Sequence, residues 1–153
     1  FQPLIQGNEF AVTAVCGPDS RVIEAVSVKK LVCADQGKIW GAVRVDLPGL
    51  TAAVTKFLDT VRWRGPVELE FIRESIRERF MLIDVNPRFP AWIGYTADLG
   101  INLPRIAVTT ALGRPSPGST PADDLVFVRA CTEFPARVQS FALFTGHGGH
   151  AHD

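Results

Sequence analysis

The stretch of sequence that decides the fold reads VELEFI at residues 67–72 and MLIDVNPR at residues 81–88. In both segments polar and apolar residues alternate, which is the period of a β-strand with one buried face. The residues between the segments are polar enough for a solvated turn, so together they predict a β-hairpin. Alternation puts Glu68 and Glu70 on one face of the first strand and Leu69 and Phe71 on the other.

The same alternation puts Asp84, Asn86 and Arg88 on one face of the second strand, and the loop length fits a register with Glu70 beside Asp84. Two carboxylates directly opposite each other destabilise a sheet. A bound cation removes that repulsion, and Mg²⁺ takes one or two carboxylates and completes its coordination with water and substrate phosphates. An acidic hairpin is also commonly a solvated surface with weak ion pairs, so spacing alone leaves both interpretations open.

Glu70, followed by Asp84-x-Asn86-x-Arg88, resembles the C-terminal signature of the ATP-grasp superfamily. Within that superfamily, Asn86-Pro87-Arg88 is most similar to the carbamoyl-phosphate-synthase-like and biotin-carboxylase-like branch. The resemblance implies that Glu70, Asp84 and Asn86 hold Mg²⁺, or Mn²⁺ in its place, on the phosphates of ATP. It also implies that Arg88 is the catalytic residue that faces the transferred phosphoryl group.

The first ten residues, FQPLIQGNEF, resemble the hinge segment of the same family. The resemblance implies that Gln2 and the backbone of Ile5 contact adenine, and that Glu9 accepts hydrogen bonds from the ribose hydroxyls. Gln2 stands where the family usually has an acid, but its amide oxygen can still accept from the adenine amino group. Pro3 replaces a lysine of the family, so that ligand is absent. The same stretch also reads as an ordinary turn before a strand.

Basic and aromatic residues elsewhere supply further candidates. Lys29 and Lys30 face opposite ways on alternation, so only one of them can point into the cleft. The resemblance implies a basic residue here, and we expect Lys29 to approach the ATP phosphates or a carboxylate substrate, with surface solvation as the alternative. Arg44 can hold an anionic substrate with its planar fork, or can be a strand-edge arginine. Residues 89–95 include the aromatic residues Phe89, Trp92 and Tyr95. We expect their side chains either to form a wall over the cleft or to pack in the hydrophobic core.

The rest of the chain predicts an α+β fold with a mainly antiparallel sheet and helices packed on one side. Strands are predicted at residues 10–15, 21–30, 39–43 and 125–134, and helices at 49–62, 90–99 and 103–112. We expect residues 1–113 to form an ATP-grasp C-terminal lobe and residues 114–145 to add an exposed loop and a returning strand to the same domain. Residues 146–153 predict a disordered, His-rich tail.

Composition narrows the functional classes. The 153 residues carry a formal net charge of zero, which argues against a general nucleic-acid or membrane-surface role. No apolar run reaches the length of a transmembrane helix. The three cysteines, Cys16, Cys33 and Cys131, are odd in number and widely spaced, so they predict neither a zinc site nor a disulfide framework. We expect Cys16 and Cys131 to be buried thiols, and a reducing cytoplasm is the default location.

The resemblance runs from residue 1 to about residue 113 and covers the second half of an ATP-grasp unit. We therefore expect a fragment or subunit of an ATP-dependent carboxylate–amine (or thiol) ligase that acts through an acyl phosphate. Its partners would be ATP, small carboxylate and amine substrates, and the missing N-terminal lobe in cis or trans. We expect the isolated chain to be inactive and to self-associate as a homo-oligomer. The alternatives are a non-catalytic nucleotide-binding or regulatory module and a small interaction domain without nucleotide.

Overall fold

The computed structural model describes residues 4–34, 37–115, 118–122, 125–130 and 135. Within these residues six strands and three helices follow one another along the chain. In chain order they are β1 (Gly7–Cys16), β2 (Val22–Cys33), β3 (Ile39–Arg44), α1 (Pro48–Val61), β4 (Gly65–Glu74), β5 (Phe80–Asn86), α2 (Gly94–Asp98), α3 (Leu103–Ala111) and β6 (Val126–Val128).

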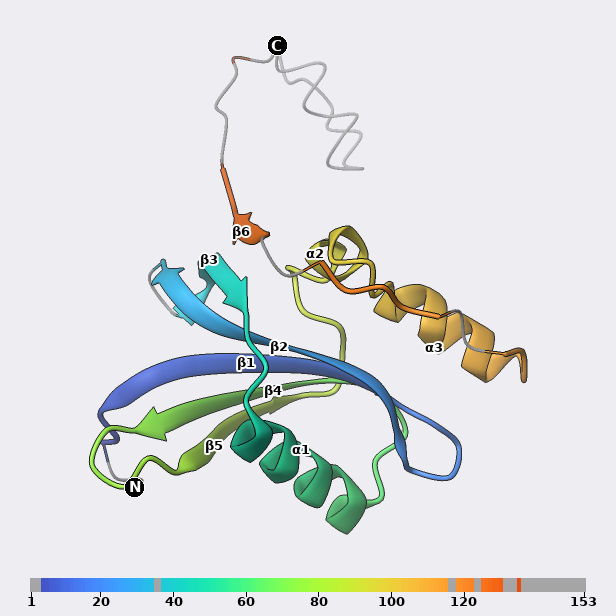
Figure 1. Ribbon diagram of the computed structural model, residues 1–153, viewed down its shortest axis with the longest axis horizontal. Coiled ribbons are helices and arrows are strands. Elements are labelled where there is room, and N and C mark those ends of the chain that lie inside the picture. The colour runs from blue at the N-terminus through green and yellow to red at the C-terminus, as the bar shows by residue number, and fades with distance from the viewer. Residues whose placement is uncertain (1–3, 35–36, 116–117, 123–124, 131–134, 136–153) are drawn as a thin grey trace, which may run out of the picture.

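The strands form one antiparallel sheet in the order β5-β4-β1-β2-β3-β6. The predicted α+β class is confirmed, but the helices do not all lie on one side. Figure 1 shows α1 below the sheet, and α2 and α3 above it. The reason lies in β1, where the seven residues from Phe10 to Cys16 are all buried. A central strand that is apolar on both faces needs cover on both sides.

Below the sheet, α1 buries Leu50, Val54 and Leu58. They pack with the strand residues Phe10 and Leu69 in one apolar cluster. Pro48 stands in the first turn of the helix, where its missing N–H removes no hydrogen bond. Arg62 ends the helix in the left-handed conformation, with φ of 53°. On this side of the molecule, an amphipathic helix packs its apolar face against the sheet.

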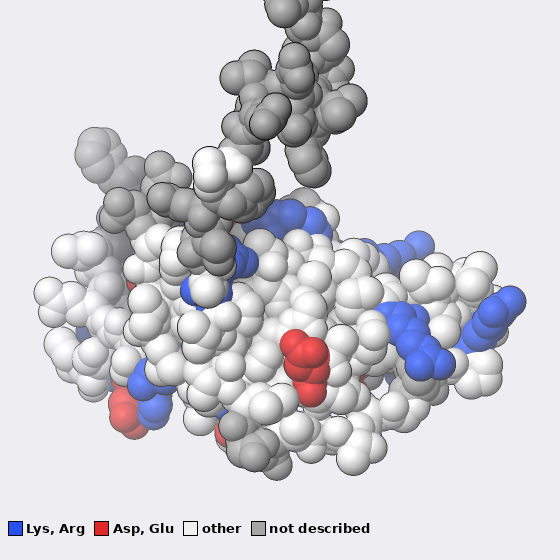
Figure 2. All heavy atoms as spheres, turned by 90° about the horizontal axis from the view of Figure 1, so that it is seen from above, with Lys and Arg blue, Asp and Glu red and all other residues white. Residues whose placement is uncertain are grey.

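Above the sheet, a second apolar cluster joins α2 and α3 to β1 and β2. Its fully buried members include Leu99 and Leu103 from the helical side and Ala11 and Val28 from the strands. Figure 2 looks onto this side of the molecule, and the surface there is mostly uncharged, with a few separated Lys, Arg, Asp and Glu side chains.

The β4–β5 hairpin carries the predicted carboxylate register. Glu70 pairs with Asp84, as the sequence predicted, whereas Phe71 pairs with Leu82. Ile83 therefore has no partner across the ladder, and β5 contains a β-bulge at this residue. A bulge inserts one residue and locally re-aims the side chains around it. Without it, the turn register would set Ile83, rather than Asp84, opposite Glu70.

Some sequence predictions fall outside the described residues, namely those for Gln2, Cys131 and the tail 146–153. Cys16 is buried, as predicted, and Cys33 is exposed. The returning strand is present as β6, which pairs with β3. No helix in the described part of the chain combines the length and the apolarity needed to cross a bilayer.

Candidate functional site

The upper face of β4 and β5 borders a cleft with a volume of about 620 Å³. Four predicted site residues line it together: Glu70, Asp84, Asn86 and Arg88. The remaining lining residues come from the β2–β3 connection, β3, β4, the segment after β5 and the residue after β6. They are Gly37, Lys38, Ile39, Glu68, Phe89, Ala91, Trp92 and Arg129.

Glu70 and Asp84 are cross-strand neighbours on β4 and β5. The amide Nδ2 of Asn86 donates to Asp84 Oδ2 at 2.8 Å, which leaves the amide oxygen to act as a ligand. Carboxylate and amide oxygens are the donors that Mg²⁺ accepts, with the rest of its octahedron filled by water and phosphate. The described residues contain no group of three or more His, Cys, Asp or Glu side chains suited to a metal. Two carboxylates and one amide oxygen are too few to complete an octahedron, so a Mg²⁺ ion at this cleft would need water or phosphate oxygens as further ligands.

Lys30 on β2 forms an ion pair with one acid of this pair, Glu70. Its Nζ donates to Glu70 Oε2 at 2.5 Å and to Glu9 Oε2 at 3.1 Å, and its side chain is only 2% exposed. Burial by itself lowers the pKa of Lys30, but the hydrogen bonds and charges of Glu70 and Glu9 outweigh burial and raise that pKa. Lys30 is therefore a buried, charged ammonium group shared between two carboxylates.

Of the two lysines, the structure places Lys30, and not Lys29 as expected, on the side of the acids. Lys29 pairs with Phe10, and Phe10 belongs to the apolar cluster under α1. Residues that are directly opposite in a ladder share a face, so Lys29 lies on the α1 side and Lys30 on the cleft side. Alternation in sequence showed that the two differ, but only the pairing of β2 with β1 shows which lysine meets the acids.

Glu68 on β4 accepts hydrogen bonds from two other residues that line the cleft. Its Oε2 accepts from Arg88 Nη1 at 3.1 Å, and its Oε1 accepts from Trp92 Nε1 at 3.1 Å. The pKa of Glu68 is raised, mainly by burial and also by the negative charge of Glu70. The hydrogen bond from Trp92 and the contact with Arg88 lower this pKa but do not cancel the rise. Arg88 is thus oriented over the cleft by a buried acid, while its own side chain stays 56% exposed.

Arg129 and Lys38 add two cations that the sequence did not single out. Arg129 follows β6, and its backbone N–H donates to Trp40 O at 2.8 Å. Its guanidinium Nη2 donates to Ala91 O at 3.3 Å, so it links the end of β6 to the segment after β5 at the cleft. The pairing of β6 with β3 brings Arg129 here from far along the chain, and no local pattern could have predicted it.

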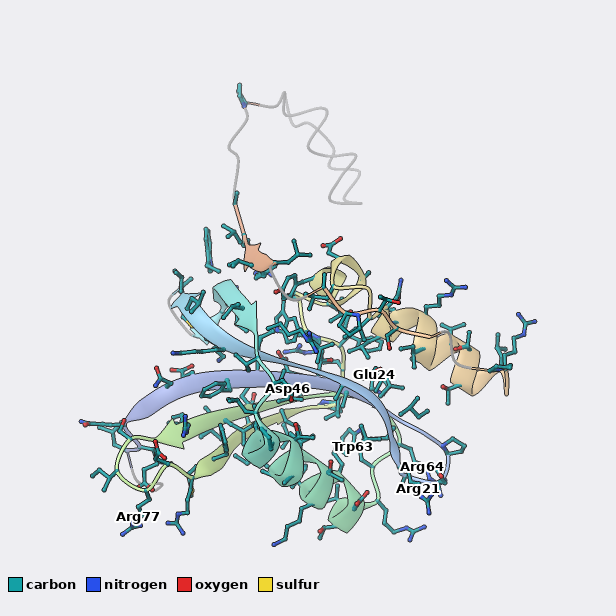
Figure 3. All side chains as sticks on the ribbon, in the orientation of Figure 1. Arg21, Glu24, Asp46, Trp63, Arg64 and Arg77 are labelled. Carbon is teal, nitrogen blue, oxygen red and sulfur yellow. The ribbon has the colours of Figure 1, made fainter. Side chains whose placement is uncertain are left out.

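The other predicted ligands lie elsewhere. Arg44 lies outside this cleft. It lines a separate hollow of about 310 Å³ together with Glu24 and Asp46. Figure 3 labels Glu24 near β2 and Asp46 near the start of α1. Ile5 lines a hollow beside the β4–β5 turn with Arg77, at the end of the sheet where Figure 3 labels Arg77. Glu9 joins the cleft acids through Lys30, as described above.

The acid pair, the asparagine and the arginine lie together at one cleft of an antiparallel sheet, and this α+β arrangement matches the fold of an ATP-grasp lobe. The chain belongs to the ATP-grasp family: residues 1–134 match the family described as "ATP-grasp in the biosynthetic pathway with Ter operon". The predicted superfamily is thereby confirmed. No curated protein matches the chain by sequence.

Solved structures agree on the fold. The phosphoribosylaminoimidazole carboxylase ATPase subunit from Aquifex aeolicus is 12% identical, with a TM-score of 0.59 over 71% of this chain and 35% of that one. The N5-carboxyaminoimidazole synthetase from Staphylococcus aureus complexed with ADP is 14% identical, with a TM-score of 0.58 over 76% of this chain and 32% of that one. The carboxyaminoimidazole ribonucleotide synthase from Aspergillus clavatus complexed with ATP is 15% identical, with a TM-score of 0.52 over 76% and 31%. The chain thus spans about a third of the length of these enzymes.

Proposed function

We propose that this chain is the nucleotide- and metal-binding half of an ATP-dependent carboxylate–amine (or thiol) ligase. The observation that carries the proposal is the cross-strand pairing of Glu70 with Asp84 at a cleft that Asn86 and Arg88 also line. Membership of the ATP-grasp family supports it. So do the ADP and ATP complexes of the Staphylococcus aureus and Aspergillus clavatus enzymes.

In this proposal Glu70, Asp84 and Asn86 would hold Mg²⁺, or Mn²⁺ in its place, beside the phosphates of ATP. The metal ion would supply positive charge to offset the negative charge that develops during phosphoryl transfer. The protein residues contribute position: the β-sheet fixes the two carboxylates, and the Glu68 ion pair fixes Arg88. Preorganised groups of this kind lower the barrier of phosphoryl transfer with no covalent step on the protein.

The reaction proceeds in two transfers. A substrate carboxylate oxygen attacks the γ-phosphorus, the bond to the β-phosphate bridging oxygen breaks, and ADP leaves with that electron pair. An amine (or thiol) then attacks the acyl carbon and displaces phosphate, while its proton passes to solvent or phosphate. Arg88 is placed to stabilise the phosphoryl oxygens in the first transfer and the tetrahedral oxyanion in the second. Glu9 is proposed to accept from the ribose hydroxyls, and Gln2 and Ile5 to contact adenine.

The proposal includes an N-terminal lobe, in cis or in trans, that closes over the phosphates and completes the site. Closure excludes water and positions the γ-phosphoryl group, which supplies much of the rate in such reactions. The 153-residue chain is therefore expected to fold, bind ATP weakly and show no ligase turnover. Self-association through the surface that the lobe would cover is also proposed. A coupled ADP-release assay over carboxylate and amine panels, with light scattering for mass, checks both points.

A binding experiment tests the proposal on the chain itself. Binding of Mn²⁺ with ATP is followed by electron paramagnetic resonance for the wild type and for a Glu70→Gln/Asp84→Asn double variant. Glu78→Gln is the matched control, because Glu78 is an exposed acid of the same hairpin that pairs with Arg73 outside the cleft. Loss of binding in the double variant alone supports the metal site. Equal binding by all three proteins assigns the hairpin to a solvated surface and rejects the proposal.

A further inference from the structure

Lys30 stands in an unusual place for a lysine. Its side chain is 2% exposed, and its Nζ lies 2.5 Å from a carboxylate oxygen of Glu70, which the proposed function makes a metal ligand. Glu9 holds the same Nζ from the other side at 3.1 Å. A side chain buried in the middle of a sheet and bonded to two acids cannot turn out to solvent. The ammonium group therefore stays beside the acid pair whatever binds there.

A fixed ammonium group acts oppositely on two kinds of ligand. It repels a bare divalent cation at Glu70 and Asp84, because like charges in a partly buried site are weakly screened. It attracts the phosphate chain of a nucleotide, which brings several negative charges to the same cleft. Arg88 differs in this respect, because its side chain is 56% exposed and can move with the ligand.

We propose that Lys30 makes the cleft select a divalent cation bound to a phosphate anion over the bare cation. The inference rests on the proposed function, because it takes Glu70 and Asp84 as ligands of the cation. Lys30 is a positioning residue in this account: it stabilises Glu70 in the free protein and discourages capture of metal without nucleotide. Metal would then enter the site mainly as a metal–nucleotide complex.

The chain offers a matched control in the adjacent residue. Lys29 has the same side chain but lies on the α1 face of the sheet. Wild type, Lys30→Gln and Lys29→Gln are compared by electron paramagnetic resonance for binding of Mn²⁺ alone and of Mn²⁺ with ADP. Lys30→Gln is expected to tighten binding of Mn²⁺ alone about tenfold and to weaken binding of Mn²⁺ with ADP about tenfold. Lys29→Gln is expected to change neither.

The opposite direction of the two changes separates this proposal from a merely structural role, which would weaken both. Weakening of both affinities, or no change in either, in a folded Lys30→Gln chain overturns the inference. If circular dichroism shows that Lys30→Gln does not fold, Lys30→Met, which fills the same space without charge, carries the same test. If the wild type binds Mn²⁺ neither alone nor with ADP, the proposed function itself fails. Binding by the wild type with no effect of Lys30 rejects only this inference.

Discussion

The two faces of β1 and β4 are built from alternate residues of the same strands, yet they differ in chemistry. On the face under α1, the buried strand residues are apolar, among them Phe10, Val12 and Leu69. On the cleft face, the strands bury apolar residues such as Ala11 and Val15 under α2 and α3, but they also bury Thr13, Glu68 and, on β2, Lys30. Buried polar groups stabilise a fold less than apolar ones and cost free energy when unpaired. The comparison teaches that both faces stabilise the sheet through apolar burial, whereas only the cleft face also buries polar and charged groups, at a cost in stability.

The largest expected effect is on turnover by the complete enzyme. Glu70→Gln and Asp84→Asn on the cleft face are each expected to abolish magnesium-dependent ADP release, because each removes a proposed metal ligand. The free energy of unfolding should stay close to that of the wild type for Asp84→Asn, since Asp84 is an exposed residue. Near-normal turnover by either variant would show that the metal site is misassigned, and with it the division between the two faces.

Arg88→Lys should have the next largest effect. The substitution keeps the charge but loses the planar fork that meets phosphoryl oxygens. We expect kcat to fall by about 10²–10³-fold with little change in the KM for ATP, the size typical for removal of one transition-state donor. Steady-state kinetics of the complete enzyme decide the point. An effect on KM alone would assign Arg88 to uniform nucleotide binding.

On the opposite face, Leu69→Ala tests stability rather than activity. Leu69 is fully buried against α1, so truncation is expected to lower the free energy of unfolding by about 2–5 kcal/mol. Ile83→Ala is the control, because Ile83 is 37% exposed at the bulge, and it should cost less than about 1 kcal/mol. Urea unfolding measures both. Equal losses for the two variants would contradict the assignment of Leu69 to a stabilising apolar core under α1.

The smallest effect comes from exchanging residue types between the faces. Thr13 is completely buried on the cleft face, and its Oγ1 has no hydrogen-bond partner among the described residues. Thr13→Val should therefore raise the free energy of unfolding by about 1 kcal/mol. The reciprocal Val12→Thr places a hydroxyl under α1 and should lower it by about 1–3 kcal/mol. Thermal unfolding compares the two, and a destabilising Thr13→Val would indicate that the hydroxyl has a partner after all.

The sequence predicted the local part of the site and missed the part made by long-range pairing. The Glu70–Asp84 register follows from alternation and the length of one turn, and both lie within a single hairpin. Lys30 could not be separated from Lys29, because that choice depends on how β2 pairs with β1. Arg129 reaches the cleft only because β6 joins β3. Helices on both sides of the sheet could have been predicted from the seven buried residues of β1, which are apolar in both alternating sets apart from Thr13.

The bulge at Ile83 also bears on how this hairpin can vary through evolution. Between the turn and Asp84, β5 holds one residue more than the ladder needs. Loss of one residue from this stretch would therefore give a regular strand and still leave Asp84 opposite Glu70. Insertions and deletions usually shift a strand by one residue and reverse its faces. Here the bulge residue is not needed for pairing. The hairpin can therefore lose one residue near its tip while Glu70 and Asp84 remain directly opposite each other.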